Sequence, residues 1–138
     1  MGYTNYWEFE TITPSEWAQL AERARHIVSE AAASGIVLTH EFDTETPPYI
    51  GADLIRFNGL GYDGHETFYL ERESSGFNFC KTNRKPYDAA VVAVLLAAER
   101  IVPSFEWKSD GRFGGDEHLN GVDLLIKSTE SQLGETHA

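Results

Sequence analysis

Apolar and polar positions follow two different periods along the chain, and the change of period separates helices from strands. From residue 14 to residue 35, apolar residues recur at three- and four-residue steps while polar residues take the other face, which is the pattern of an amphipathic helix. Thr13, Pro14 and Glu16 supply a capping threonine, a proline at the first helical position and a capping-box glutamate. Gly35 supplies the left-handed residue that commonly follows a helix. We predict a helix from Pro14 to Ser34.

Two more helices are predicted, from Pro86 to Ile101 and from Glu117 to Leu133, the last one weakened by Gly121. Residues 89–98 are uninterruptedly apolar, which is about half of the roughly 20 residues that cross a bilayer. Because this run is apolar on every side, it must be covered by a sheet and other helices or by a partner subunit. This helix is therefore either deeply buried or the seam of a dimer, and we expect a homo-oligomer.

Segments rich in aromatic and β-branched residues predict the strands. They cover residues 2–9, 36–42, 52–58, 66–72, 77–81 and 104–109. The glycines between residues 58 and 66 predict a hairpin bend, and residues 52–81 together favour an antiparallel meander. We therefore predict a single α+β domain, residues 1–134, in which an antiparallel or mixed sheet of four to six strands packs against two to three helices, with a flexible tail at residues 135–138.

The composition supports one folded domain and narrows the choice of partners. The chain has 138 residues, 41% hydrophobic and 24% charged, and its formal net charge is −11. A field of this sign repels DNA, RNA and anionic lipid, so we expect neither long nucleic acid nor a membrane as a partner. The single cysteine, Cys80, cannot form an internal disulfide, and no secretory signal opens the sequence. Both features favour a cytoplasmic location.

Residues 80–88, CKTNRKPYD, depart from this acidic background. Lys81, Arg84 and Lys85 lie directly before a predicted helix start, where unpaired N–H groups carry a partial positive charge. Such a segment could hold a phosphate or a carboxylate. Asp88 allows a different interpretation, because its carboxylate could bind the same N–H groups and pair with Arg84 or Lys85. The helix would then be self-capped beside a solvated basic loop.

Two other clusters contribute candidate side chains. His65 and Glu66 begin a strand after the glycine-rich bend. His65 could act as a general base or bind a ligand, although a lone loop histidine is more often structural, and strand alternation sends His65 and Glu66 to opposite faces. Near the start of the chain, alternation places Tyr3 and Trp7 on one face and Tyr6 on the other. Such aromatic rings either build the core or, at a rim, stack on a planar ring such as a nucleobase.

The usual catalytic and metal-binding templates do not occur in the sequence. The five histidines lack ligand spacing, HETF is not HExxH, and there is no GxSxG elbow, GK[ST] phosphate loop or strand-borne GxGxxG. We therefore expect no metal site and no cofactor, and we favour binding over catalysis.

The same segments carry a resemblance to a family. MGYTNYW, LIRFNG with HETF, and FCKTNRKPYD before an apolar helix resemble a widespread family of small phage and bacterial proteins that typically begin MGYTHYW and share HETF and FCKTARKPYD. The resemblance covers about residues 1–100 and implies a phage or mobile-element origin, hence a bacterial host cell. Asn5 stands where the family usually has histidine, which argues against a base or metal ligand there but leaves hydrogen bonding intact. The matching positions include Tyr3, Tyr6, Trp7, Asn58, His65, Glu66, Phe68, Lys81, Thr82, Arg84, Lys85, Tyr87 and Asp88.

From these patterns we expect a non-catalytic binding protein for a small anionic, nucleotide-like ligand, which in a phage setting would be a nucleotide signal of host defence. The basic segment would hold phosphate, the N-terminal rings would stack on the ligand, and Asn58 or His65 would read its polar edges. The candidate ligand-binding residues are Tyr3, Tyr6, Trp7, Asn58, His65, Lys81, Thr82, Arg84, Lys85, Tyr87 and Asp88.

Two alternatives from other functional classes remain open. In a phosphoesterase-type hydrolase, His65 would be the general base, and Lys81 or Arg84 would stabilise developing phosphate charge. In an acidic protein-binding inhibitor, the surface charge would imitate nucleic acid.

Overall fold

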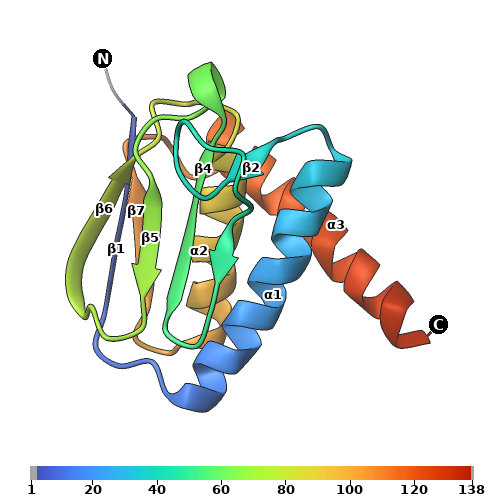
Figure 1. Ribbon diagram of the computed structural model, residues 1–138. Coiled ribbons are helices and arrows are strands. Elements are labelled where there is room, and N and C mark those ends of the chain that lie inside the picture. Colours follow the sequence, from blue (N-terminus) through green and yellow to red (C-terminus); the bar gives the residue numbers. More distant parts are fainter. Residues whose placement is uncertain (1–2, 138) are drawn as a thin grey trace.

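Three helices and two antiparallel sheets make up the computed structural model, which describes residues 3–137 (Figure 1). The first sheet has the order β6 (Gly76–Lys81), β1 (Thr4–Phe9), β7 (Glu106–Ser109). The second is built on β4 (Leu54–Gly59), which pairs with β2 (Leu38–Thr39), β3 (Tyr49–Ile50) and β5 (Phe68–Glu71). The helices are α1 (Pro14–Ala33), α2 (Asp88–Ile101) and α3 (Asp116–His137), with a short 3-10 turn η1 at Gly61–Asp63. The predicted α+β class is confirmed, with the strands divided over two sheets.

The hydrogen bonds at the two ends of α1 are those that the sequence predicts. The Thr13 hydroxyl accepts from the Glu16 N–H at 3.1 Å, and the Glu16 carboxylate accepts from the Thr13 N–H at 2.9 Å. This confirms the capping box. Gly35, with φ at 86°, and the following residue donate their N–H groups to carbonyls in the last turn, which is a Schellman motif.

Replacing Thr13 with alanine removes one half of the capping box. We expect the free energy of unfolding to fall by about 1 kcal/mol, measured by chemical denaturation. Thr11→Ala, at an exposed position just before the cap, is the matched control and should change little. Equal losses in the two variants would contradict the capping role of Thr13.

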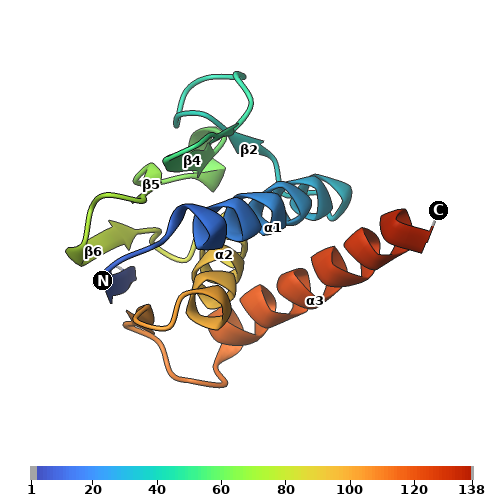
Figure 2. The same ribbon diagram turned by 90° about the horizontal axis from the view of Figure 1, so that it is seen from below.

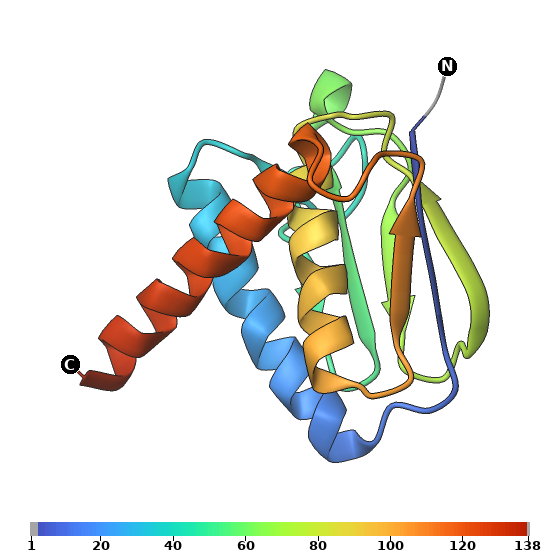
Figure 3. The same ribbon diagram turned by 180° about the vertical axis from the view of Figure 1, so that it is seen from behind.

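α2 lies at the centre of the molecule and packs against both α1 and α3 (Figure 3). Within its apolar run only Ala89 and Leu96 are partly exposed. The apolar surface of α2 is therefore buried within one chain. It does not require a partner subunit to cover it. The homo-oligomer stays a prediction. Among residues 3–137, no helix combines the length and the apolar character needed to span a membrane.

The path of the chain after β5 differs from the predicted meander. The hairpin of β4 and β5 is confirmed, with Phe57 opposite Phe68. β6, however, pairs with β1, so the prediction that it continues the meander is wrong. Asn5, Trp7 and Phe9 of β1 are all buried, and a buried strand needs hydrogen-bonding neighbours on both edges. β6 and β7 supply them.

The C-terminal helix extends beyond its predicted end at Leu133. α3 continues to His137, and its last turns project away from the other helices (Figure 2). Flexibility of residues 135–137 stays a prediction, and residue 138 lies outside the described residues.

Candidate functional site

The segments singled out in the sequence meet at one end of the molecule, where β6 and β7 end and α2 begins (Figure 1). The N–H groups of Thr82 and Asn83 both donate to the Tyr3 carbonyl at 3.0 Å. The Lys81 N–H donates to the Glu66 carboxylate at 2.7 Å, so the end of the outer edge of β6 is closed by a side chain. We call this meeting point, formed by residues 3–5, 66, 80–88 and 107–111, the motif junction.

Asp88 is the centre of a buried polar network in the motif junction. One carboxylate oxygen of Asp88 accepts from the Asn5 side-chain amide at 2.8 Å and from the Thr82 hydroxyl at 2.5 Å. The Asn5 amide oxygen accepts in turn from the Trp107 indole N–H at 2.9 Å. Burial raises the pKa of Asp88, and the two hydrogen bonds oppose that rise. Asn5 and Thr82 are fully buried, so Thr82 and the bonded oxygen of Asp88 serve the fold and are closed to a ligand.

The first N–H groups of α2 donate to backbone carbonyls of the chain and not to the Asp88 carboxylate. The N–H groups of Asp88 and Ala90 donate to the carbonyls of Lys85 and Tyr87, at 2.9 and 3.0 Å. Both interpretations of this helix start are corrected by this geometry. The preceding turn uses the N–H groups itself, and the Asp88 carboxylate is directed at β1.

Arg84 meets an N-terminal ring, as the sequence predicts, but both partners are already engaged. Its guanidinium lies 4.8 Å from the centre of the Tyr3 ring and donates through Nε to Glu117, and this ion pair raises the pKa of Arg84. Tyr3 is 1% exposed and donates its hydroxyl to Ser109 at 2.9 Å. A β-carbon at Gly111 would lie 2.9 Å from the Tyr3 ring, so the ring is covered and has no free face for stacking.

Two further candidates are occupied in the core and in the β4–β5 bend. Trp7 is 3% exposed and packs 5.3 Å from the ring of Phe68. Asn58 is fully buried, donates to the His65 carbonyl and the Thr67 hydroxyl, and accepts from two backbone N–H groups. Its hydrogen-bonding capacity is used in shaping the bend, so it cannot read a ligand edge. His65 is exposed, and within residues 3–137 its ring forms no hydrogen bond, ion pair or ring contact with the other candidates.

Cys80 and Tyr87 are buried residues of the motif junction. The Tyr87 hydroxyl donates to the Glu66 carbonyl at 2.5 Å, and burial raises its pKa. Burial also raises the pKa of Cys80 to about 12. The thiol is therefore kept in its unreactive, protonated form at neutral pH.

Alkylation provides a test of this burial. Compared with an exposed thiol of ordinary pKa near 8.5, Cys80 should react with iodoacetamide about a thousandfold more slowly at neutral pH. The reaction should become fast once denaturant unfolds the chain, as followed by mass spectrometry. Equal rates in the folded and unfolded protein would contradict the buried position.

The remaining accessible candidates lie on the opposite face of β1. Residues paired directly across antiparallel strands share a face. Tyr6 is opposite Phe79 on one side and Lys108 on the other, while Glu8 is opposite Phe77. In Figure 1 no helix lies over this side of the β6–β1–β7 sheet, and Phe77 and Phe79 are 67% and 60% exposed.

The rings of Tyr6, Phe77 and Phe79 are close enough to form one surface. The ring centres of Tyr6 and Phe77 are 5.8 Å apart, and those of Phe77 and Phe79 are 6.2 Å apart. Lys81 is opposite Thr4 on the same side of the sheet. We call Tyr6, Phe77, Phe79, Lys81 and Lys108 the aromatic face.

A shallow hollow of about 160 Å³ opens beside Tyr6 and Phe77. Its other lining residues are Trp7, Glu8, Glu106 and Lys108. Of the aromatic face, the sequence singled out only Tyr6 and Lys81. The alternation of Phe77 and Phe79 with Asn78 and Cys80 was the available signal, but it does not say which face of the strand is covered. Lys85, half-buried in the preceding loop, lies outside this set.

Within residues 3–137 no group of three or more histidine, cysteine, aspartate or glutamate side chains could hold a metal ion. The resemblance to the phage and bacterial family stays a prediction, because comparison with protein-family models, with curated proteins and with solved structures finds no match.

Proposed function

We propose that the aromatic face binds a small, planar, anionic ligand of the nucleotide type without turning it over. The observation that carries the proposal is that the half-buried Tyr6 and the exposed Phe77 and Phe79 lie side by side on a sheet, with lysines at neighbouring positions. Clustered exposed aromatic side chains are unusual on a soluble domain and commonly mark an interaction site.

The three rings provide a stacking platform. A base stacked on an exposed aromatic side chain gains about 1–3 kcal/mol, independent of its identity. Tyr6 donates its hydroxyl to Asp110 at 2.9 Å, and the same carboxylate accepts from the Thr4 N–H at 3.0 Å. The Tyr6 ring is thus held in place before a ligand arrives, which reduces the ordering cost of binding.

The charged side chains around the aromatic face favour one orientation of an anionic ligand. Lys108 flanks Tyr6, and Lys81 lies beyond Phe79. The Asp110 carboxylate also lies at this end, where Tyr6 and Thr4 donate to it. Glu8 and Glu106 lie at the other end of the face, which is therefore the more negative one. Phosphate should therefore sit toward the lysines and be repelled from the glutamates. The overall charge of −11 opposes long polyanions, so a single nucleotide-like molecule fits this face better than a nucleic acid strand.

Binding without catalysis is supported by the state of the conspicuous titratable groups. The Asp88 carboxylate and the Tyr87 hydroxyl are buried and hydrogen-bonded within the chain. Neither lies on the aromatic face, so the face itself offers stacking and charge but no poised acid–base pair.

Calorimetry with ADP and with cyclic dinucleotides tests the proposal. Wild-type protein should bind at least one of them, and Phe79→Ala should weaken that binding about 5- to 150-fold, which corresponds to the loss of about 1–3 kcal/mol. Lys108→Gln should also weaken it and reduce its salt dependence. Tyr62→Ala is the matched control, because Tyr62 is 93% exposed but lies in η1.

The outcomes separate the functional classes. Intact nucleotide recovered after denaturation supports binding, whereas new products would support the hydrolase alternative. Absence of heat with every nucleotide, or unchanged affinity in Phe79→Ala, would overturn the proposal. Tighter binding of an oligonucleotide than of a mononucleotide would overturn the assignment to a small ligand.

A further inference from the structure

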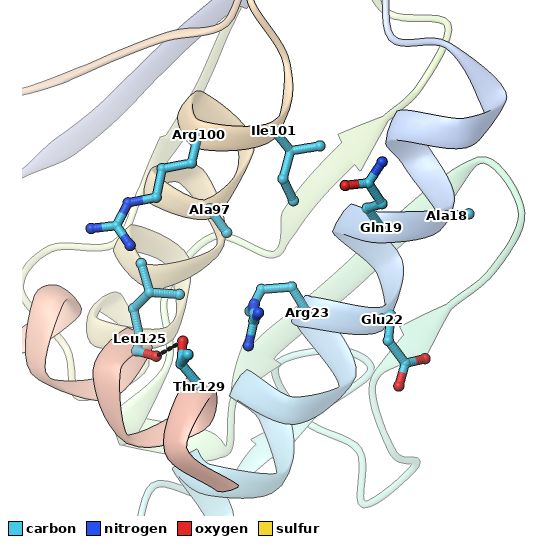
Figure 4. Close-up of a pocket in the computed structure, with 9 residues that line it drawn as sticks. All are labelled: Ala18, Gln19, Glu22, Arg23, Ala97, Arg100, Ile101, Leu125 and Thr129. Carbon is cyan, nitrogen blue, oxygen red and sulfur yellow. Dashed lines mark hydrogen bonds between the residues drawn. The ribbon is translucent and has the colours of Figure 1, made fainter. Parts of the chain in front are cut away.

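A cleft of about 560 Å³ lies among the three helices (Figure 4). Its walls come from α1, α2 and α3 alone, so it is separate from the aromatic face. It contains two arginines, Arg23 from α1 and Arg100 from α2. Cavities of this size accommodate small organic ligands.

Arg23 is the unusual group in this cleft. Its side chain is half-buried and extends toward α2 and α3 in Figure 4, and its Nη1 atom is buried without a hydrogen-bond partner. Burial and the neighbouring positive charge of Arg100 both lower its pKa. A buried guanidinium donor without an acceptor carries a desolvation cost, and the cost is unusual in a chain with twice as many acidic as basic residues.

Glu22, the carboxylate among the lining residues, does not relieve this charge. Glu22 lies on the rim of the cleft and raises the pKa of Arg23 only as the smallest of the three influences. Its oxygens are 3.4 Å from the Arg25 guanidinium and 3.2 Å from the His26 ring. The cleft therefore keeps an excess of positive charge.

Of the other lining residues, Gln19 and Thr129 are polar, and the apolar ones are Ala18, Ala97, Ile101 and Leu125. Ala97 and Ile101 of α2 and Leu125 of α3 line the cleft beside the arginines. Thr129 already donates its hydroxyl to the Leu125 carbonyl at 2.9 Å. The cleft thus offers one guanidinium group from α1 and one from α2, which lie apart in Figure 4 and would turn toward a shared oxyanion, and an apolar surface for the remainder of the molecule.

We propose that this cleft binds a phosphate monoester, with the phosphoryl group held by Arg23 and Arg100 and an apolar substituent packed against Ala97, Ile101 and Leu125. A phosphate monoester is a dianion at neutral pH and neutralises both guanidinium groups, whereas a carboxylate would leave one charge uncompensated. The phosphoryl oxygens would also give the buried Nη1 atom of Arg23 the acceptor that it lacks.

Phenyl phosphate is a suitable probe, since it joins the two features that the cleft would recognise. We expect isothermal titration to show binding, and Arg23→Gln and Arg100→Gln each to weaken it about tenfold or more. Arg25→Gln is the matched control, because Arg25 is on the same helix but does not line the cleft. Benzoate should bind more weakly than phenyl phosphate. Potassium chloride at equal ionic strength should give no heat of binding.

Three results would overturn the proposal. They are no binding of phenyl phosphate to the wild-type protein, binding to both arginine-to-glutamine variants that is as tight as to the wild type, and binding of benzoate that is as tight as that of phenyl phosphate. Inorganic phosphate that binds as tightly as phenyl phosphate would overturn the role of the apolar wall. Phenyl phosphate bound at the aromatic face would be weakened by Phe79→Ala and unaffected by Arg23→Gln, whereas binding in the cleft would show the reverse, so failure here and failure of the aromatic-face proposal can be told apart.

A second measurement does not depend on the variants folding. In methyl NMR spectra of the wild-type protein, phenyl phosphate should shift the resonances of Ile101 and Leu125. Shifts confined to residues of the β6–β1–β7 sheet would place the ligand elsewhere and overturn the assignment.

Discussion

Asp88→Ala is expected to lower the free energy of unfolding by about 2–5 kcal/mol. The Asp88 carboxylate is the acceptor for the Asn5 amide and the Thr82 hydroxyl, both fully buried. Alanine leaves these two donors without a partner, and each orphaned buried donor costs about 1–3 kcal/mol. Denaturant unfolding measures the loss. Asp53→Ala, at an exposed aspartate, should change the value by less than about 0.5 kcal/mol.

Asparagine at the same position separates hydrogen bonding from charge. Asp88→Asn keeps an oxygen acceptor, so its cost should be smaller than that of alanine. Burial raises the pKa of Asp88, so the folded state binds the proton more tightly than the unfolded state, whose pKa is about 3.9. The stabilisation from this difference is fully present below the unfolded pKa and is lost as pH rises through the folded pKa.

The stability of wild-type protein relative to Asp88→Asn should therefore decline as pH rises from about 3.5 toward neutrality. Denaturant unfolding of both proteins at several pH values gives this difference. A relative stability that increases with pH would mean that the network lowers the pKa of Asp88 and would contradict the dominant role of burial.

Gly121→Ala is expected to destabilise the domain by about 1–3 kcal/mol, although alanine favours helices over glycine by about 1 kcal/mol. A β-carbon at Gly121 would lie 2.3 Å from Cγ1 of the fully buried Val92 and 3.3 Å from the backbone nitrogen of Ala93. α3 crosses α2 at this point (Figure 3), so the two helices would have to move apart. The added methyl group therefore costs more in packing than it gains in helix propensity.

The neighbouring position provides the control for Gly121. Asn120 is exposed in the same helix, so Asn120→Ala should be neutral or slightly stabilising. Thermal and denaturant unfolding of both variants would measure the contrast. Stabilisation by Gly121→Ala would show that α2 and α3 do not approach as closely as described.

Local signals were sufficient for some elements and insufficient for others. α1 could be predicted because its boundaries depend on Thr13, Glu16 and Gly35, which act within one turn of the helix. The pairing of β6 with β1 could not be predicted, because it joins residues that are more than 60 positions apart in the sequence. The glycine in α3 was predicted as a weakness from its helix propensity, whereas its role is close packing against Val92.

The candidate site shows the same division. Alternation along β1 separated Tyr6 from Tyr3 and Trp7, and the structure places these residues on opposite faces. The alternation alone could not show that the face with Tyr3 is buried and the face with Tyr6 is open, because that depends on where the helices pack. The rings of Phe77 and Phe79 gain their significance only from the register that sets them beside Tyr6.

The most direct test of the aromatic-face proposal is an NMR titration of the wild-type protein with ADP, observing the aromatic ring resonances. We expect the rings of Tyr6, Phe77 and Phe79 to shift together along one saturable curve, while Trp17, which is buried in the core and does not line the hollow, changes little. Saturable binding that leaves these three rings unmoved, or no binding at all, would contradict the account.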